Sequence, residues 1–172
     1  MSGSLRTMTE DDLERVRRWR NHPDVRRYMY TTHEIDPAEH RAWFERTRDS
    51  DRSELMIYED EGLPLGFVNL ARGRSRQVAD WGFYLAPEAA RGTGKALGRA
   101  ALRHAFEGLE LHKVCGQALG FNDRSIKFHR SLGFVQEGCL RDQHYDGQAY
   151  HDVVCFGLLR QEWKNSLGSD EP

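Results

Sequence analysis

The chain has 172 residues, a length that suits one globular domain. Its 25 Lys and Arg residues nearly balance its 27 Asp and Glu residues, and the formal net charge of -2 at pH 7 argues against a protein that mainly coats nucleic acid or an anionic membrane. Hydrophobic residues make up 38% and charged residues 30% of the chain, which argues against disorder, and no apolar run is long enough for a membrane span.

The cysteines and the first residues indicate a reduced, cytoplasmic protein. Cys115, Cys139 and Cys155 are odd in number and widely spaced, so they predict neither a disulfide framework nor a zinc site. The eight histidines form no HExxH motif, and we expect no bound metal. The residues after Met1 lack the basic and apolar regions of a secretion signal.

The first 50 residues are dominated by helical patterns. A short strand at 5–7 is followed by Thr9, which is placed as the N-cap of a helix through residue 19. A second short helix is expected over 24–30. A third helix begins after Asp36, where a proline occupies the first helical position and a glutamate is placed for a capping box, and it ends near residue 49.

The middle of the chain changes to strand patterns, which predict an antiparallel meander over 55–58, 65–71 and 78–85. Residues 59–63 contain Glu-Gly and predict the first hairpin turn. The remaining elements are a helix after Gly94, a strand at 113–119, a helix at 122–132, strands at 134–140 and 150–158, and a final turn at 160–164. This order predicts one mixed α/β domain over 1–165, with a flexible tail at 166–172.

A glycine-rich turn before a helix is the most informative segment for chemistry. Gly92 and Gly94 let the backbone approach an anion, and the free amides of a helix N-terminus point toward it. Arg91 and Lys95 add positive charge, so the expected ligand is a phosphate or pyrophosphate. The segment fits neither a Walker A loop nor GxGxxG, and by itself an ordinary helix start remains an alternative.

The spacing of two motifs identifies a family resemblance. Arg91-x-x-Gly94-x-Ala96 matches Q/R-x-x-G-x-G/A, and about 30 residues later the segment from Asn122 to Phe134 resembles N-x-x-[SA]-x-x-[FL]-[YH]-x-x-x-G-F. On these motifs, residues 4–164 resemble the GNAT superfamily of N-acetyltransferases. The resemblance implies an α/β fold whose mostly antiparallel sheet of about seven strands is splayed at the cofactor site, with helices on both faces.

The same resemblance implies acetyl-CoA as cofactor. In the family the glycine loop grips the pyrophosphate, a strand bulge pairs with the pantetheine arm, and the asparagine of the second motif contacts that arm. The implied cofactor-binding residues are Tyr84, Leu85, Arg91, Gly92, Thr93, Gly94, Lys95, Ala96 and Asn122.

Acetylation of an amine by a thioester requires a held cofactor, a neutral amine and a proton for the departing thiolate. His129 occupies the position where many relatives carry a tyrosine general acid, and a histidine can donate a proton near neutral pH. The alternatives are that His129 only packs in the fold, or that the thiolate needs no strong acid. No general base stands out, and we expect direct attack by the amine.

The first 50 residues combine arginines with aromatic residues, which suits an acceptor with a phosphate and a flat ring, such as a nucleotide-linked amino sugar. The alternative is that these aromatic residues form helix core. The stretch WRNHPDVRRYMYTTHEI, the later WGFYL and the ending near EW resemble the UDP-4-amino-4,6-dideoxy-N-acetyl-β-L-altrosamine N-acetyltransferases of pseudaminic acid biosynthesis. The implied acceptor-site residues are Met29, Tyr30, His33, Phe44 and Tyr84, with Asn69 orienting the amine or its water.

Three other functions remain open at this stage. A ribosomal-protein-type N-terminal acetyltransferase shares the opening Leu-Arg pattern and the Leu-Gly-Phe ending of the second motif. A non-catalytic acyl-CoA-binding module would retain the loop without turnover, and an aminoglycoside acetyltransferase would require an acidic pocket. We expect a small-molecule acceptor, no nucleic-acid or membrane partner, and exposed strands near the C-terminus that could pair across a homodimer.

Overall fold

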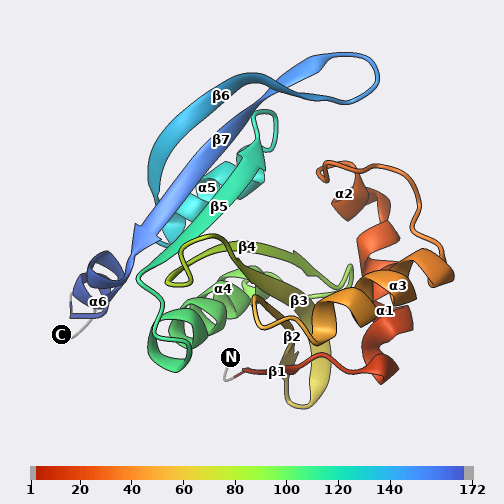
Figure 1. The fold of residues 1–172 in the computed structure, drawn as a ribbon, viewed down its shortest axis with the longest axis horizontal. Helices are drawn as coiled ribbons and strands as arrows, with labels where there is room; N and C mark the ends of the chain where they lie inside the picture. The colour runs from red at the N-terminus through yellow and green to blue at the C-terminus, as the bar shows by residue number, and fades with distance from the viewer. Residues whose placement is uncertain (1–2, 169–172) are drawn as a thin grey trace. The chain divides into compact units, whose positions relative to one another are not determined.

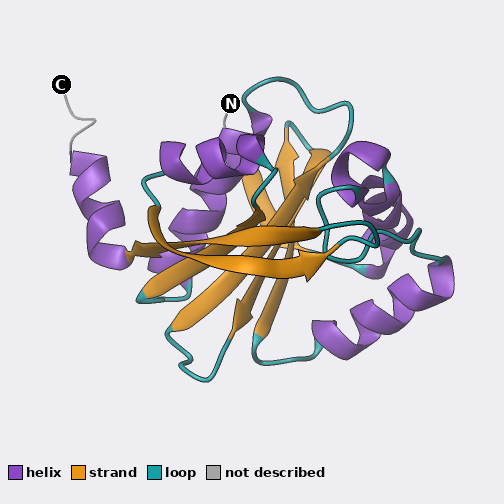
Figure 2. Ribbon diagram, turned by 90° about the horizontal axis from the view of Figure 1, so that it is seen from above, coloured by secondary structure: helices purple, strands orange, loops and turns teal. Residues whose placement is uncertain are grey.

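A computed structural model describes residues 3–168, and its strands form a seven-stranded mixed sheet in the order β1-β2-β3-β4-β5-β7-β6 (Figure 1). The strands are β1 (Ser4–Thr7), β2 (Ser53–Asp60), β3 (Leu63–Arg72), β4 (Val78–Leu85), β5 (Lys113–Leu119), β6 (Val135–Tyr145) and β7 (Tyr150–Leu159). Figure 2 distinguishes them from the helices and loops that connect them. The predicted α/β class and mixed sheet are confirmed.

The helices follow the predicted order, with two short additions. They are α1 (Leu13–Asn21), α2 (Pro23–Arg26), α3 (Pro37–Arg48), α4 (Thr93–Arg103), α5 (Asp123–Ser131) and α6 (Arg160–Gly168). A 3-10 turn, η1 (Glu10–Asp12), precedes α1, and a π-helical turn, η2 (His104–Gly108), follows α4. Within residues 3–168, no helix combines the length and apolar character needed to cross a membrane.

The residues cluster into two compact units. Among the described residues, the N-terminal unit contains those up to Ala71 together with Trp81–Ala101, and the C-terminal unit contains Arg72–Asp80 and those from Leu102 to Gly168. The division falls inside β4, whose first residues belong to the C-terminal unit. The organisation of 1–165 as one domain therefore stays a prediction.

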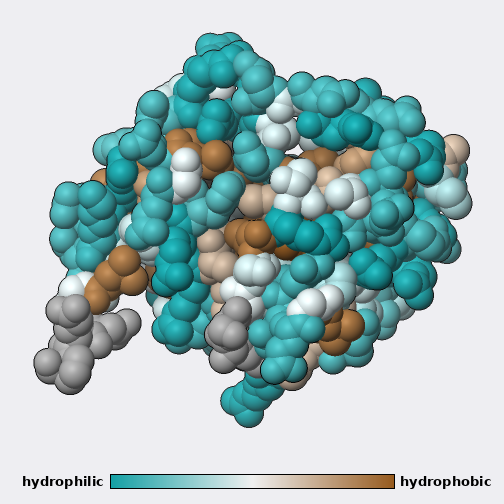
Figure 3. Space-filling model, turned by 90° about the horizontal axis from the view of Figure 1, so that it is seen from below, coloured by the Kyte–Doolittle hydropathy of each residue, from teal (hydrophilic) through white to brown (hydrophobic). Residues whose placement is uncertain are grey.

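The N-terminal unit is built on a core between α1, α3 and the β2–β3 hairpin. Its buried cluster includes Val16 and Trp19 of α1, Phe44 of α3, Ile57 of β2 and Phe67 of β3. Burial of these side chains provides the main driving force for the packing of the two helices. The face seen in Figure 3 is mainly hydrophilic, as the 30% charged composition requires once the apolar residues are enclosed.

Local signals place the helices of this unit. The Thr9 backbone amide donates to the Asp12 carboxylate at 2.9 Å, and Arg6 donates to both oxygens of that carboxylate at 2.7 and 2.8 Å. Asp36 caps α3 by accepting the Glu39 amide at 2.8 Å. The Asp36 cap is confirmed, whereas Thr9 is the N-cap of η1 and Asp12 is the N-cap of α1. The second helix is shorter than predicted, because the chain leaves helical geometry after α2 and turns through residues 27–30.

The hairpin turn between β2 and β3 is confirmed, with Glu61 at φ 51° and Gly62 at φ 75°. Positive φ at both central residues is typical of a type I′ turn, whose twist matches that of the flanking strands. The register pairs Met56 with Val68 and Leu55 with Asn69, so the position of Asn69 in the sheet is set by this hairpin.

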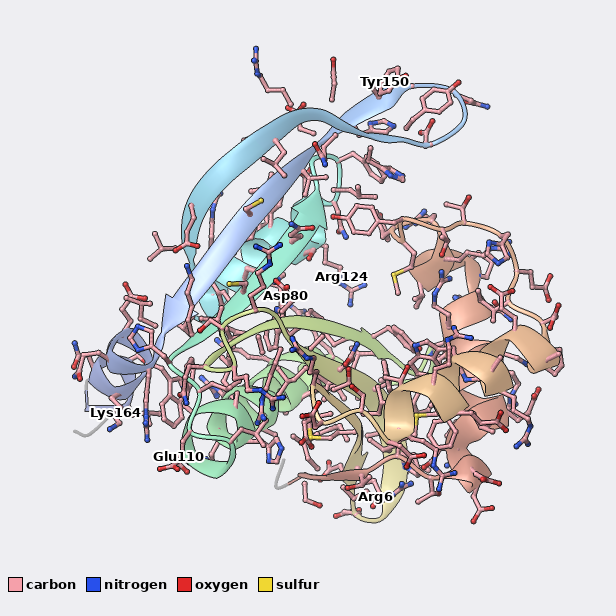
Figure 4. The ribbon with its side chains drawn as sticks, in the orientation of Figure 1. Arg6, Asp80, Glu110, Arg124, Tyr150 and Lys164 are labelled. Atoms are coloured by element: carbon pink, nitrogen blue, oxygen red, sulfur yellow. The ribbon has the colours of Figure 1, made fainter. Side chains whose placement is uncertain are left out.

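The C-terminal unit joins strands in both orientations. A parallel ladder pairs Val78–Asp80 of β4 with Lys113–Cys115 of β5, and β4 continues to Leu85 beyond its last pair. Strand β7 runs antiparallel to both β5 and β6. Figure 4 labels Asp80, where the parallel ladder ends, and Tyr150, where β7 begins.

Strand β6 is longer than the predicted 134–140, because it continues to Tyr145. The additional residues are mostly exposed, so they show no alternating hydrophobic pattern. The end of the strand is held instead by pairing of His144 and Tyr145 with β7. Asp146 closes the hairpin by accepting the Gln148 and Ala149 amides, both at 2.8 Å. The final turn is also longer than predicted, since α6 includes residues 166–168 of the expected tail; residues 169–172 lie outside the described residues.

Candidate active site

The predicted phosphate loop lies at the start of α4. Gly92 has φ 95°, a left-handed conformation that favours glycine, and α4 begins at the next residue. The Thr93 amide donates to the Ala90 carbonyl and the Ala96 amide donates to the Gly92 carbonyl, both at 3.1 Å. The amides of Gly94 and Lys95 lie in the first turn, where no intrahelical acceptor exists.

This loop fits a pyrophosphate. The unpaired first-turn amides and the positive end of the helix both favour an anion. Arg91 and Lys95 are exposed, so their charges can reach a ligand in solvent. The Thr93 side chain is fully buried and its Oγ1 has no hydrogen-bond partner, which leaves one more polar group available beneath the loop.

Helix α4 is seated on β3 through a glycine. A Cβ atom at Gly66 would collide with Leu97 Cδ1 of α4, and it would lie 3.2 Å from Leu85 Cδ2. Leu97 is completely buried at this contact. Gly66 therefore allows the close approach that holds the helix, and the loop at its start, against the sheet.

A cavity of about 380 Å³ lies wholly within the N-terminal unit. One of its walls is aromatic. The rings of Phe67 and Tyr84 lie 5.0 Å apart between centroids, and Trp43 meets Phe67 edge-on at 5.9 Å. Burial raises the pKa of Tyr84, so its phenol keeps its proton at neutral pH. Flat rings of this kind can stack on a planar ligand.

Polar side chains from α1, α3 and β3 also line the cavity. Arg20 donates through Nη2 to the Thr31 carbonyl at 2.7 Å and to the Thr31 hydroxyl at 2.9 Å. His40 stacks on Trp43 with ring centroids 5.0 Å apart. Burial, followed by the nearby Arg17 charge, lowers the pKa of His40, so its ring is neutral at pH 7. Asn69 completes this polar lining.

The charges lining the cavity are unequal. Arg20 and Arg46 contribute two guanidinium groups, whereas Glu39 is the acidic residue of the lining. The Glu39 carboxylate is also engaged by His33, whose Nε2 lies 2.9 Å from Oε1. The cavity therefore favours a ligand with anionic or neutral oxygen groups over a polycation.

The structure brings together three of the predicted acceptor-site residues, since Met29, Asn69 and Tyr84 all line this cavity. His33 and Tyr30 are outside the lining; His33 contacts the lining residue Glu39, and Tyr30 is 52% exposed. Phe44 lies in the hydrophobic core at 2% exposure and does not line the cavity. The roles of these residues stay predictions, and for Phe44 the geometry favours packing.

Sequence reasoning did not assign Arg20, His40, Trp43, Arg46 or Phe67 to the site. The signal was present in part, because the arginine and aromatic content of the first 50 residues indicated an acceptor region. Composition does not say which face of a helix a residue occupies, so the individual residues could not be chosen.

His129 and Asn122 belong to the C-terminal unit. His129 is 1% exposed and stacks on Phe156 at 4.9 Å, and its Nδ1 lies 2.8 Å from the Ser125 carbonyl oxygen, to which it donates. Burial lowers its pKa, so the ring is neutral at pH 7. This geometry favours a packing role, and the proton-donor role stays a prediction. Asn122 caps α5 by accepting the Ser125 amide at 3.1 Å; its predicted cofactor contact is likewise untested.

Comparisons with known proteins agree with this fold. The acetyltransferase (GNAT) domain model matches residues 4–135. The putative ribosomal N-acetyltransferase YdaF of Bacillus subtilis (strain 168) is 36% identical over 71% of this chain and 67% of its own. Acetyltransferase PseH of Campylobacter jejuni (serotype O:23/36, strain 81-176) is 26% identical over 76% of this chain and 83% of its own.

A solved structure shows the same fold. Spermidine N-acetyltransferase from Vibrio cholerae, crystallised with CoA and spermine, superposes with a TM-score of 0.87 at 23% identity, covering 95% of this chain and 98% of the other. The family model covers most of the chain, and the loop at Gly92–Ala96 fits the cofactor that the family uses. The chain belongs to the GNAT family and is an acetyl-CoA-dependent N-acetyltransferase.

Proposed function

We propose that the acceptor is the amino group of a nucleotide-linked sugar, specifically a UDP-linked 4-amino-4,6-dideoxy sugar. The observation that carries this proposal is the cavity in which Arg20 and Arg46 face a ligand space bordered by Trp43, Phe67 and Tyr84. Guanidinium groups pair with phosphate, and aromatic faces stack on a base or a sugar ring. The similarity to acetyltransferase PseH adds support.

On this proposal, one group of residues binds acetyl-CoA and another group holds the acceptor. Acetyl-CoA supplies the acetyl group as an activated thioester. The loop residues Arg91–Ala96 would hold its pyrophosphate, the β4 backbone at Tyr84–Leu85 would pair with its pantetheine arm, and Asn69 would orient the acceptor amine. The cavity in the N-terminal unit would hold the rest of the acceptor. The neutral amine would form the new C–N bond directly as the thioester C–S bond breaks, and the proton that the amine loses would balance the departing CoA thiolate, which leaves as the free thiol.

Charge argues against a polyamine as acceptor, although a spermidine acetyltransferase shares the fold. A polyamine would bring several positive charges to a cavity that already holds two guanidinium groups. Glu39 could offset part of this repulsion, but His33 already engages its carboxylate.

A ribosomal-protein-type acetyltransferase is the second candidate, favoured by the 36% identity to YdaF. Its acceptor would be the N-terminal amine of a peptide. A basic peptide terminus would meet the same excess of guanidinium groups, which weighs against this candidate.

The deciding experiment compares three acceptors with the full chain and acetyl-CoA, measuring release of free thiol. The acceptors are UDP-4-amino-4,6-dideoxy-N-acetyl-β-L-altrosamine, N-terminal peptides of ribosomal proteins, and spermidine. We expect turnover on the nucleotide sugar with kcat/KM well above that for the other two. Turnover on peptides or spermidine alone would reassign the acceptor, and turnover of none of the three would refute the proposed acceptor.

A charge-reversal pair makes the test specific for the cavity. Arg46→Glu should lower kcat/KM for the nucleotide sugar, because the anionic acceptor loses a favourable charge and meets a repulsive one. Arg74→Glu is the matched control, since Arg74 is exposed in the β3–β4 turn and does not line the cavity. Equal effects of both variants would contradict the cavity as the acceptor site.

A further inference from the structure

Three buried polar atoms without a hydrogen-bond partner belong to side chains that line the same cavity. They are Arg20 Nη1, His40 Nε2 and Asn69 Oδ1. Arg20 and His40 are 9% and 5% exposed, so solvent does not satisfy them. Buried polar groups are normally paired because an unpaired one costs stability, and each exception calls for an explanation. Their shared location indicates groups that a ligand completes.

The donor and acceptor character of each atom follows from its other contacts. The Leu13 backbone acts to raise the pKa of His40, which favours a proton on the ring, and Nε2 has no hydrogen-bond partner. We therefore assign the proton of the neutral ring to Nδ1. A neutral ring with its proton on Nδ1 presents a lone pair at Nε2. Asn69 Oδ1 is likewise an acceptor, whereas Arg20 Nη1 can only donate. The cavity lining thus holds two unmatched acceptors and one unmatched donor.

The surroundings of His40 keep its ring in this state. The charged groups of α1 that act on it are Glu14, Arg17 and Arg20, and burial has a larger effect than any of them. On α3, the adjacent Glu39 is engaged by His33. A residue needed only to pack on Trp43 and bond Leu13 would not require a second ring nitrogen, so Nε2 is the feature of His40 that packing leaves unexplained.

We propose that Arg20, His40 and Asn69 form a subsite that positions the reacting amine of the acceptor and an oxygen beside it. N–H or O–H groups of the acceptor donate to His40 Nε2 and Asn69 Oδ1, and a neighbouring oxygen accepts from Arg20 Nη1. This inference rests on the proposed function: an amino sugar carries N–H donors next to oxygen acceptors. A protonated polyamine carries donors alone and would leave the Arg20 donor unmatched.

Two variants of His40 separate its ring nitrogens. His40→Asn places an amide near the Nδ1 position, which keeps a donor there but deletes the Nε2 acceptor. His40→Gln places an amide oxygen near the Nε2 position. We expect His40→Asn to lower kcat/KM for the acceptor roughly 10- to 100-fold, as for a lost hydrogen bond at a buried site, with unchanged affinity for acetyl-CoA. His40→Gln should recover part of this loss.

The matched control is His112→Asn, since His112 is exposed in the C-terminal unit and should leave kcat/KM unchanged. Normal acceptor kinetics in both His40 variants, with only a lower melting temperature, would show that His40 is purely structural and would overturn the proposal. The proposal would also be overturned if the two variants lost activity equally and both lost acetyl-CoA binding.

A spectroscopic measurement keeps this inference separate from the identity of the acceptor. The His40 Nε2 resonance, assigned by its absence in His40→Gln, is followed by 15N NMR while acceptor is added to the acetyl-CoA-depleted full chain. The probe is whichever amine the turnover assay identifies. A shift toward the hydrogen-bonded position supports the subsite even if that amine is not a nucleotide sugar. An unchanged Nε2 resonance at saturating acceptor refutes the subsite even if that amine is a nucleotide sugar.

Discussion

The backbone of the phosphate loop can be tested by Gly92→Ala. Gly92 has φ 95°, and a Cβ atom added there would meet no other heavy atom within 4 Å. The substitution therefore creates no collision, and its whole effect is the cost of holding an L-residue in a left-handed conformation. That cost is on the order of 1–3 kcal/mol.

This cost appears either in the affinity for acetyl-CoA or in the free energy of unfolding. If the loop relaxes to another conformation in the absence of ligand, acetyl-CoA must restore the competent one, and its affinity falls by the populated fraction. A cost of about 1–3 kcal/mol corresponds to roughly 5- to 150-fold weaker binding. If the fold holds the loop in place, the same cost lowers the free energy of unfolding.

The assay is isothermal titration of acetyl-CoA, paired with thermal unfolding of the same variant. Gly73→Ala is the matched control, because Gly73 also has open space around its Cβ position but no positive φ. We expect weaker binding for Gly92→Ala and wild-type binding for Gly73→Ala. Wild-type affinity and wild-type stability in Gly92→Ala would refute the reasoning, since the left-handed conformation would then carry no cost.

Three further predictions concern buried groups and a cap. Burial acts to raise the pKa of Asp12, but hydrogen bonds from Arg6 and Thr9 outweigh it and lower the pKa overall. The carboxylate therefore stabilises the fold above its unfolded pKa of about 4. This stabilisation is lost as the pH falls through the lower folded pKa. Asp12→Asn should lower the free energy of unfolding by roughly 2–3 kcal/mol at pH 7, measured by urea unfolding. This is less than the cost of breaking a fully buried ion pair, because Arg6 is partly exposed. An equal cost at pH 3 would contradict the predicted pH dependence. His129→Ala should lower the melting temperature, and it should lower kcat more than acetyl-CoA affinity if His129 donates a proton; a wild-type kcat at every pH removes His129 from the chemistry. Asp36→Ala should lower the free energy of unfolding by about 1 kcal/mol through loss of the α3 cap, whereas Asp36→Asn should lose little, and a large effect of both would point to a role other than capping.

Much of the fold could be predicted because its signals are local. The caps at Thr9 and Asp36, the Glu61-Gly62 turn and the glycine before α4 each act within a few residues, so their effect can be interpreted without the tertiary structure. Strand β6 shows the limit of such signals. Its exposed end is held by pairing with β7, a contact that no local pattern reveals.

The predicted cofactor loop and the cavity of the N-terminal unit show the same difference between local and tertiary signals. The loop is one continuous segment whose glycines and helix start determine its chemistry, so the sequence by itself indicated an anion site. The cavity is assembled from α1, α3, β3 and β4, and only the packing of these elements brings Arg20, His40 and Asn69 together.

Adjacent residues on α3 show the physical reason. Successive side chains of a helix point about 100° apart, so Trp43 and Phe44 cannot face the same surroundings. Trp43 lines the cavity and Phe44 enters the core. The sequence by itself determined the family and most elements and predicted the cofactor loop, whereas the rotation of each helix against the sheet decided which aromatic and basic residues line the cavity.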